Sequence, residues 1–137
     1  MIQRVQTIYL LAVAFLQTVM FFSVQATVFD EFVKETSFKI SENWQLLVAL
    51  SALLPLVTIF LFKKRRLQVR LSIINTLLLL VLQIIVVFFL INLSKEYEHV
   101  NYAINDISPA VSLILTILAI RFILKDEMKI RSYDRIR

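Results

Sequence analysis

The sequence has no glycine and no cysteine, and its 137 residues include only two prolines, Pro55 and Pro109. Without cysteine the chain has no disulfides, thiol nucleophiles, thiolate zinc sites or iron–sulfur ligands. Without glycine it has neither the usual phosphate-binding loop nor the usual dinucleotide-binding turn. The scarcity of glycine and proline also removes the signals that divide soluble chains, so we expect residues 1–137 to form one domain.

Charged residues are also scarce. They make up 18% of the chain, whereas 59% is hydrophobic. Ordinary soluble domains are roughly 25% charged and roughly 45–50% apolar. A soluble core of this size cannot bury so much apolar surface, and this composition therefore favours a membrane protein.

Four long apolar stretches cover residues 5–24, 45–62, 71–93 and 107–124. Each is near the ~20 residues that a helix needs to cross ~30 Å of hydrocarbon. Lipid offers the backbone no hydrogen-bond partners, so the stretches must be helical. We predict an all-α membrane protein with four transmembrane helices in an antiparallel up-down bundle. The second stretch is the shortest, and a helix buried in a soluble protein can have the same length. Outer loops 25–44 and 94–106, a basic inner loop 63–70 and a tail 125–137 complete the chain.

The distribution of charge predicts the orientation. Eleven of the fifteen basic residues precede the first stretch, follow the last, or lie in the inner loop, and a twelfth, Arg121, lies near the end of the last stretch; the outer loops hold three basic and seven acidic residues. By the positive-inside rule both termini and the inner loop are cytoplasmic. A signal peptide cleaved after Ala26 is the alternative for the first stretch, but its basic region is a single arginine and its apolar run is long. The basic residues of the inner loop are Lys63, Lys64, Arg65, Arg66 and Arg70.

Each apolar stretch has one mildly polar side, formed by residues three or four apart. Helices in lipid associate through small and polar side chains, so we expect these sides to face one another. The same stripes would also suit a solute path or a docking face, with Gln17 and Gln83 deepest in the hydrocarbon. Before the second and fourth stretches, Ser41 and Ser108 stand at positions typical of helix caps. The stripes are Gln3, Thr7, Leu10, Ala14 and Gln17; Ser51, Pro55 and Thr58; Ser72, Asn75, Thr76, Leu79 and Gln83; and Ser108, Ser112 and Thr116.

The residues needed for catalysis are missing. None of the four stretches contains Asp, Glu, Lys or His, although pumps and transporters usually hold an ionisable residue inside a span. The single histidine, His99, ends the segment Lys95–His99, which has possible metal ligands but more often would be a solvated loop. We expect no catalytic residue, no cofactor and no metal site, and therefore no enzyme.

The two ends of the chain resemble a known family. Met1-Ile2-Gln3-Arg4 with Gln6 and Tyr9 at the start, and Lys125-Asp126-Glu127, Arg131-Ser132 and Asp134-Arg135-Ile136-Arg137 at the finish, resemble the DUF4293 family. Its members are small four-helix inner-membrane proteins of the Bacteroidota with no assigned activity. The resemblance implies a cytoplasmic-membrane protein with four spans and implies no activity.

We therefore expect a non-catalytic accessory or scaffolding subunit of a membrane protein complex. The alternative is a small homo-oligomeric transporter or channel for a neutral solute. The expected partners are membrane lipids and either another integral membrane protein or further copies of the chain. Nucleic acid is not expected, because three acids interrupt the basic residues of the tail. The candidate partner contacts are Gln3, Arg4, Gln17, Gln83, Lys125, Asp126, Glu127, Arg131, Asp134 and Arg135.

Overall fold

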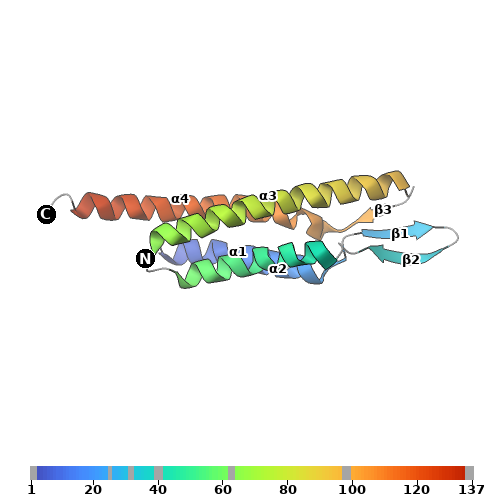
Figure 1. The fold of residues 1–137 in the computed structure, drawn as a ribbon, viewed down its shortest axis with the longest axis horizontal. Coiled ribbons are helices and arrows are strands. Elements are labelled where there is room, and N and C mark those ends of the chain that lie inside the picture. Colours follow the sequence, from blue (N-terminus) through green and yellow to red (C-terminus); the bar gives the residue numbers. More distant parts are fainter. Residues whose placement is uncertain are drawn as a thin grey trace.

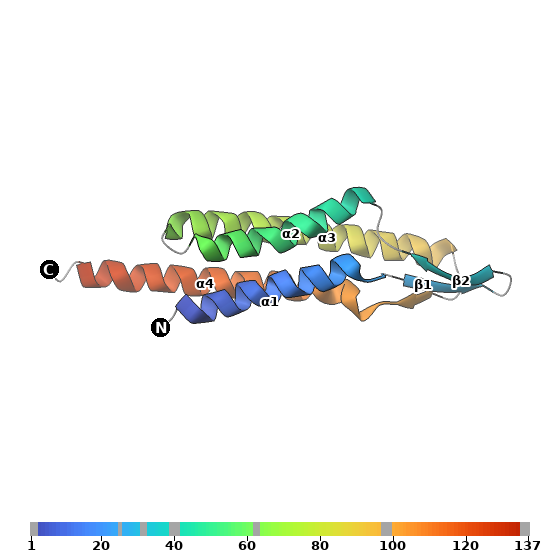
Figure 2. The ribbon, with the colours of Figure 1, turned by 90° about the horizontal axis from the view of Figure 1, so that it is seen from below.

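A computed structural model describes residues 3–24, 26–30, 33–38, 42–61, 64–96 and 100–134. Within these residues the chain forms four long helices that lie side by side and alternate in direction, with a small sheet at one end (Figures 1 and 2). The predicted four helices are confirmed and most of the described residues are helical, but the small sheet was not predicted. The elements are α1 (Gln3–Phe22), β1 (Ala26–Asp30), β2 (Val33–Phe38), α2 (Glu42–Phe60), α3 (Arg65–Glu96), β3 (Val100–Tyr102), the 3₁₀ helix η1 (Ile104–Ile107) and α4 (Ser108–Asp134).

Each helix has two main neighbours. α1 packs against α2 and α4, and α3 packs against the same two helices, so the four helices surround a common interior. The start of α1, the turn from α2 to α3 and the end of α4 lie together at one end of the molecule (Figure 1). We call this the basic end, because Lys64, Arg66 and Lys125 lie there, and we call the opposite end the sheet end.

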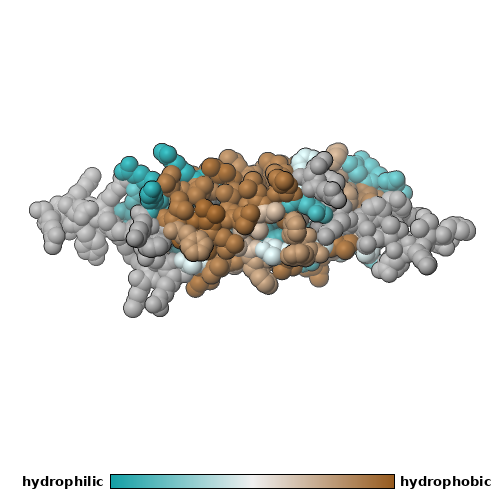
Figure 3. Space-filling model, turned by 60° about the horizontal axis from the view of Figure 1, so that its bottom comes forward, coloured by the Kyte–Doolittle hydropathy of each residue, from teal (hydrophilic) through white to brown (hydrophobic). Residues whose placement is uncertain are grey.

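Three of the described helices, α1, α3 and α4, are long and apolar enough to cross a membrane. The apolar part of α2, Trp44–Phe60, is shorter. On the face shown in Figure 3, hydrophobic side chains cover most of the middle of the molecule, and hydrophilic side chains lie mainly toward both ends. Length and composition therefore support three of the four predicted spans.

The predicted basic inner loop 63–70 is mostly helix. α3 begins at Arg65, and the backbone N–H of Gln68 donates to the carbonyl of Lys64 over 3.1 Å. Arginine, leucine and glutamine are good helix formers, and no glycine or proline interrupts the segment. The helix therefore extends through the charged residues that the hydropathy pattern excluded from the span. In the same way α4 continues to Asp134, through most of the predicted tail.

The predicted outer loops contain a three-stranded antiparallel sheet in the order β2-β1-β3. Ala26 of β1 pairs with Phe38 of β2 on one side and with Tyr102 of β3 on the other. Threonine, valine and phenylalanine in these segments favour extended backbone. Ala26 is buried against Leu93 of α3, which fixes the sheet to the end of that helix.

The helix starts follow the predictions only in part. Pro109 stands next to the first residue of α4, as expected, but within the described chain the Ser108 hydroxyl has no hydrogen-bond partner. Ser108 is itself helical, with φ −57° and ψ −38°, because η1 leads directly into α4. The predicted cap at Ser41 lies outside the described residues.

Most residues of the polar stripes face the interior, as predicted, but Gln83 is only half-buried. Gln17, Ser51, Asn75 and Thr116 are all buried. Toward the sheet end the interior becomes apolar, where Met20, Val48, Leu82 and Val86 form one cluster. The other buried stripe residues are Leu10, Ala14, Pro55, Thr58, Ser72, Leu79, Ser108 and Ser112.

Candidate functional site

Gln17 joins three helices in the middle of the molecule. Its Nε2 donates to the Ser112 hydroxyl of α4 over 2.9 Å. The Ser51 hydroxyl of α2 lies 3.2 Å from Gln17 Oε1 and 2.7 Å from the Val48 carbonyl, so its single hydrogen is shared between these two acceptors. Gln17 is fully buried. The amide of Gln17 thus donates to one serine and accepts from another of the same chain. Gln17 therefore links α1 to both α2 and α4.

A second buried hydrogen bond joins α1 to α4 at the basic end. Gln6 Nε2 donates to Asp126 Oδ2 over 2.6 Å, and both side chains are buried. One helical turn away, Tyr9 stacks on Phe122 with ring centroids 5.7 Å apart. The first and last helices are thus joined by residues from the two ends of the sequence. Asp126 was predicted as a contact for a partner, whereas the structure places it against α1 of its own chain.

A buried polar stripe runs along α3 from the basic end. Gln68, Ser72 and Asn75 lie on one helical face and are all buried. No group in the described part of the chain forms a hydrogen bond with the Ser72 hydroxyl or with either amide atom of Asn75. Gln68 was not predicted to be buried, because it lay inside the expected basic loop.

The outward face of α3 carries a groove of about 310 Å³. It is lined by Gln83, Ile84, Val87, Phe88 and Ile91. Gln83 is half-buried, and its Oε1 is enclosed without a hydrogen-bond partner among the described residues. Gln83 therefore borders a surface of α3 that faces away from Gln17, and the two glutamines do not line one path.

One acid just before α4 is buried, although the sequence predicted that it would be one of the exposed charges of the outer loops. Asp106 of η1 is 5% exposed, and neither of its side-chain oxygens has a hydrogen-bond partner in the described residues. The 3₁₀ turn from Ile104 to Ile107 rotates this side chain toward the helices. Hydropathy contains no signal for such a rotation, so the burial was missed.

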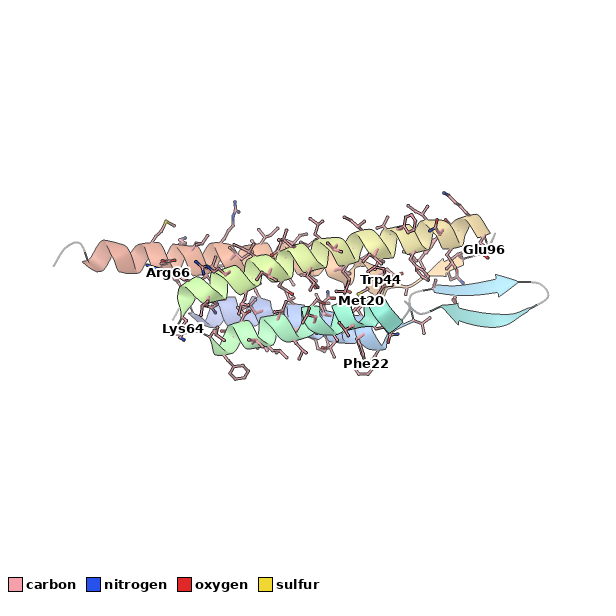
Figure 4. The ribbon with its side chains drawn as sticks, viewed as in Figure 1. Met20, Phe22, Trp44, Lys64, Arg66 and Glu96 are labelled. Carbon is pink, nitrogen blue, oxygen red and sulfur yellow. The ribbon has the colours of Figure 1, made fainter. Side chains whose placement is uncertain are left out.

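The charged residues lie at the two ends of the helices. Lys64 and Arg66 lie at the basic end and Glu96 at the sheet end, while Met20 points between the helices and Phe22 away from them (Figure 4). Of the predicted contacts, Lys125 is exposed and Glu127 is half-buried. Three residues named in the predictions lie outside the described residues: Lys63, His99 and Arg135. Five further side chains are also outside the described part: those of Gln3, Arg4, Arg65, Arg131 and Asp134.

Comparison with known families identifies one match, which covers nearly the whole chain. The model of one family, described as a domain of unknown function (DUF4293), matches residues 2–136. No curated protein and no solved structure matches the chain. The matched residues include the hydrogen bonds of Gln17, the pair Gln6 and Asp126, and the sheet. The chain belongs to the DUF4293 family.

Proposed function

We propose that the protein crosses the bacterial inner membrane four times, with both termini in the cytoplasm. The exposed cations Lys64, Arg66, Arg70 and Lys125 at the basic end support this orientation. The apolar part of α2 has 17 residues, which corresponds to about 26 Å of helix. A slightly short span is accommodated by local thinning of the bilayer and by flanking polar residues.

Cysteine labelling tests this topology, because the chain has no cysteine of its own. Single cysteines at the exposed positions Val24, Lys64, Glu96 and Lys125 are treated with a membrane-impermeant maleimide in intact cells and after lysis. We expect Val24→Cys and Glu96→Cys to react in intact cells, and Lys64→Cys and Lys125→Cys only after lysis. Labelling of Val24→Cys and Lys64→Cys from the same side would show that α2 does not cross.

We further propose that the protein is a non-catalytic accessory or scaffolding subunit that binds another membrane protein through the groove on α3. The observation that carries this proposal is the Gln83 carbonyl, an enclosed acceptor with no donor among the described residues. Lipid tails have no hydrogen-bond donor, and leaving such a group unpaired in hydrocarbon is costly. A helix that supplies a hydroxyl or indole N–H would satisfy it.

The lining of the groove favours a partner unlike α3 itself. Helix contacts in lipid depend on small residues that let two backbones approach. The groove is lined instead by Ile84, Val87, Phe88 and Ile91, which are all large. Two copies of this face would place bulky side chains against bulky side chains, whereas a helix with small residues and a donor fits it. α3 also has the smallest buried share of the three long apolar helices, so its surface is the most available.

Photo-crosslinking in the native membrane tests the docking face. A photoreactive amino acid replaces Ile84 in the groove or, as the control, Ile114 on α4, whose side chains are 60% and 61% exposed. We expect a discrete protein adduct from position 84 that is absent from position 114 and is lost with Gln83→Leu. Lipid adducts alone at both positions would contradict the accessory role. An adduct of twice the chain mass would identify a second copy as the occupant and contradict it as well.

A second candidate function is a homo-oligomeric transporter or channel for a neutral solute. It is supported by the interior polar groups of Ser72 and Asn75, for which the described residues provide no partner. Proteoliposomes loaded with a small neutral solute such as glycerol test it by light scattering. We expect transport faster than in empty liposomes and a reduced rate with Asn75→Leu. A rate equal to that of empty liposomes would exclude this candidate.

A further inference from the structure

Two side chains of α3 present unused hydrogen-bonding groups in the interior. Ser72 and Asn75 are each 1% exposed. Together they offer a hydroxyl, an amide carbonyl and an amide NH₂, and none of these atoms meets a partner among the described residues. Buried polar groups are nearly always paired with protein or with ordered water. A fully buried asparagine with both ends unpaired therefore points to a ligand.

The packing of α2 against α3 adds a further acceptor. Val48 of α2 meets Leu82 of α3 in the apolar cluster, and the two helices are antiparallel. About two turns, or seven residues, further toward the basic end, the same register brings Pro55 to the level of Asn75. Proline has no backbone N–H, so the carbonyl of Ser51 lacks its donor within the helix. Ser51 and Pro55 are both buried, which places this carbonyl on the interior side of α2.

We propose that Ser72, Asn75 and the Ser51 carbonyl form an internal hydration site occupied by ordered water. Water both donates and accepts, as this mixed set of groups requires, and a buried water typically makes about three hydrogen bonds to otherwise unpaired polar groups. None of the three residues carries a charge, which favours a neutral ligand over an ion. The site lies among closely packed helices, so its ligand can be no larger than water.

The stripe on α3 also gives the direction of access. Gln68 lies one turn from Ser72 toward the basic end and is another buried polar side chain. In the opposite direction the stripe continues as Leu79 and Leu82, which are apolar and buried. Leu82 contributes to the cluster that separates this part of the interior from the sheet end. Water therefore reaches the site from the basic end, and the apolar cluster seals it from the sheet end. This inference does not depend on the docking role of Gln83.

Cysteine accessibility in proteoliposomes tests the site. Single variants Ser72→Cys, Asn75→Cys and, as the matched control one turn beyond, Leu79→Cys are treated with a small methanethiosulfonate reagent. Thiols react as thiolates and their pKa rises in apolar surroundings, so we expect positions 72 and 75 to react at least about tenfold faster than position 79. The reaction should be fast from the side on which Lys64→Cys reacts. Equal rates at all three positions, or faster reaction from the sheet side, would overturn the proposal.

A measurement on the unmodified protein removes any dependence on how the variants fold. In water-edited solid-state NMR of the protein with ¹⁵N-labelled asparagine, magnetisation passes from water to nearby amide groups. We expect the side-chain amide of Asn75 to receive it, as do those of the exposed Asn92 and Asn101. Transfer to Asn92 and Asn101 without transfer to Asn75 would show that the interior is dry and would refute the hydration site.

Discussion

The hydrogen bond between Gln6 and Asp126 allows a direct test of the helix packing. Replacing Gln6 with leucine removes the donor and leaves a buried acid, 8% exposed, without its partner. Hydrogen bonds to charged groups contribute about 1.5–3 kcal/mol, and most of that is lost when a buried partner stays behind. We therefore expect Gln6→Leu to lower the free energy of unfolding by about 2 kcal/mol. The pair joins positions 120 residues apart, so its loss weakens the contact between the first and last helices.

Unfolding by sodium dodecyl sulfate in mixed micelles, followed by the fluorescence of the single tryptophan, Trp44, measures this change. A double-mutant cycle with Asp126→Leu isolates the pair, because removing both partners is nearly neutral when shape is kept. The matched control is Gln83→Leu, which makes the same chemical change at a carbonyl without a partner in the described chain. The stabilising role of this hydrogen bond would be refuted if Gln6→Leu lowered the free energy of unfolding no more than Gln83→Leu does. A coupling energy near zero would refute it as well.

The same titration tests three other contacts. Gln17→Leu removes the amide that joins α1 to two serines, and hydrogen bonds between helices in lipid average about 0.6 kcal/mol, so we expect a loss of about 1 kcal/mol; an unchanged midpoint would contradict this network. Tyr9→Leu removes the stacking on Phe122, and we expect it to cost about 1 kcal/mol, a value that Phe122→Leu should reproduce. Pro55→Ala restores an N–H donor for the Ser51 carbonyl, so we expect a higher midpoint and weaker water transfer to Asn75; unchanged transfer would show that this carbonyl does not hold water.

The sequence was sufficient to predict which residues lie between the helices, because long apolar stretches follow simple rules. A long apolar stretch that crosses a membrane forms a helix, so residues three and four apart share a face. Polar residues on such faces cannot meet lipid without cost. Gln17, Ser51 and Ser112 were therefore expected to point inward, and the structure confirms that they do.

The sheet was not predictable, because it depends on contacts between distant residues. β1 is the central strand, and its partner β3 follows α3, more than 60 residues later in the chain. The alternation within residues 26–38 is too short to distinguish a hairpin from an irregular loop. Ala26 has no strand preference of its own and is ordered by burial against Leu93.

The buried acids were missed because one sequence does not give the register between helices. A carboxylate beyond the end of an apolar stretch is normally solvated. Asp126 is buried because α4 continues past its apolar part and brings this side chain opposite Gln6. Gln68 was missed for another reason: the cations around it excluded it from the predicted span, although α3 begins at Arg65 and continues through them.

The part of α4 that leads into the tail has two different faces. Between residues 121 and 126, Arg121 and Lys125 are exposed, whereas Phe122 and Asp126 contact α1. The spacing of a helix separates the charges, so the acid completes the packing while the cations face outward. A partner or an anionic lipid surface at the basic end therefore meets Arg121 and Lys125, whereas Asp126, the acid next to Lys125, is held by Gln6. On this basis removal of Lys125 alters only surface attraction, whereas removal of Asp126 alters the helix packing itself.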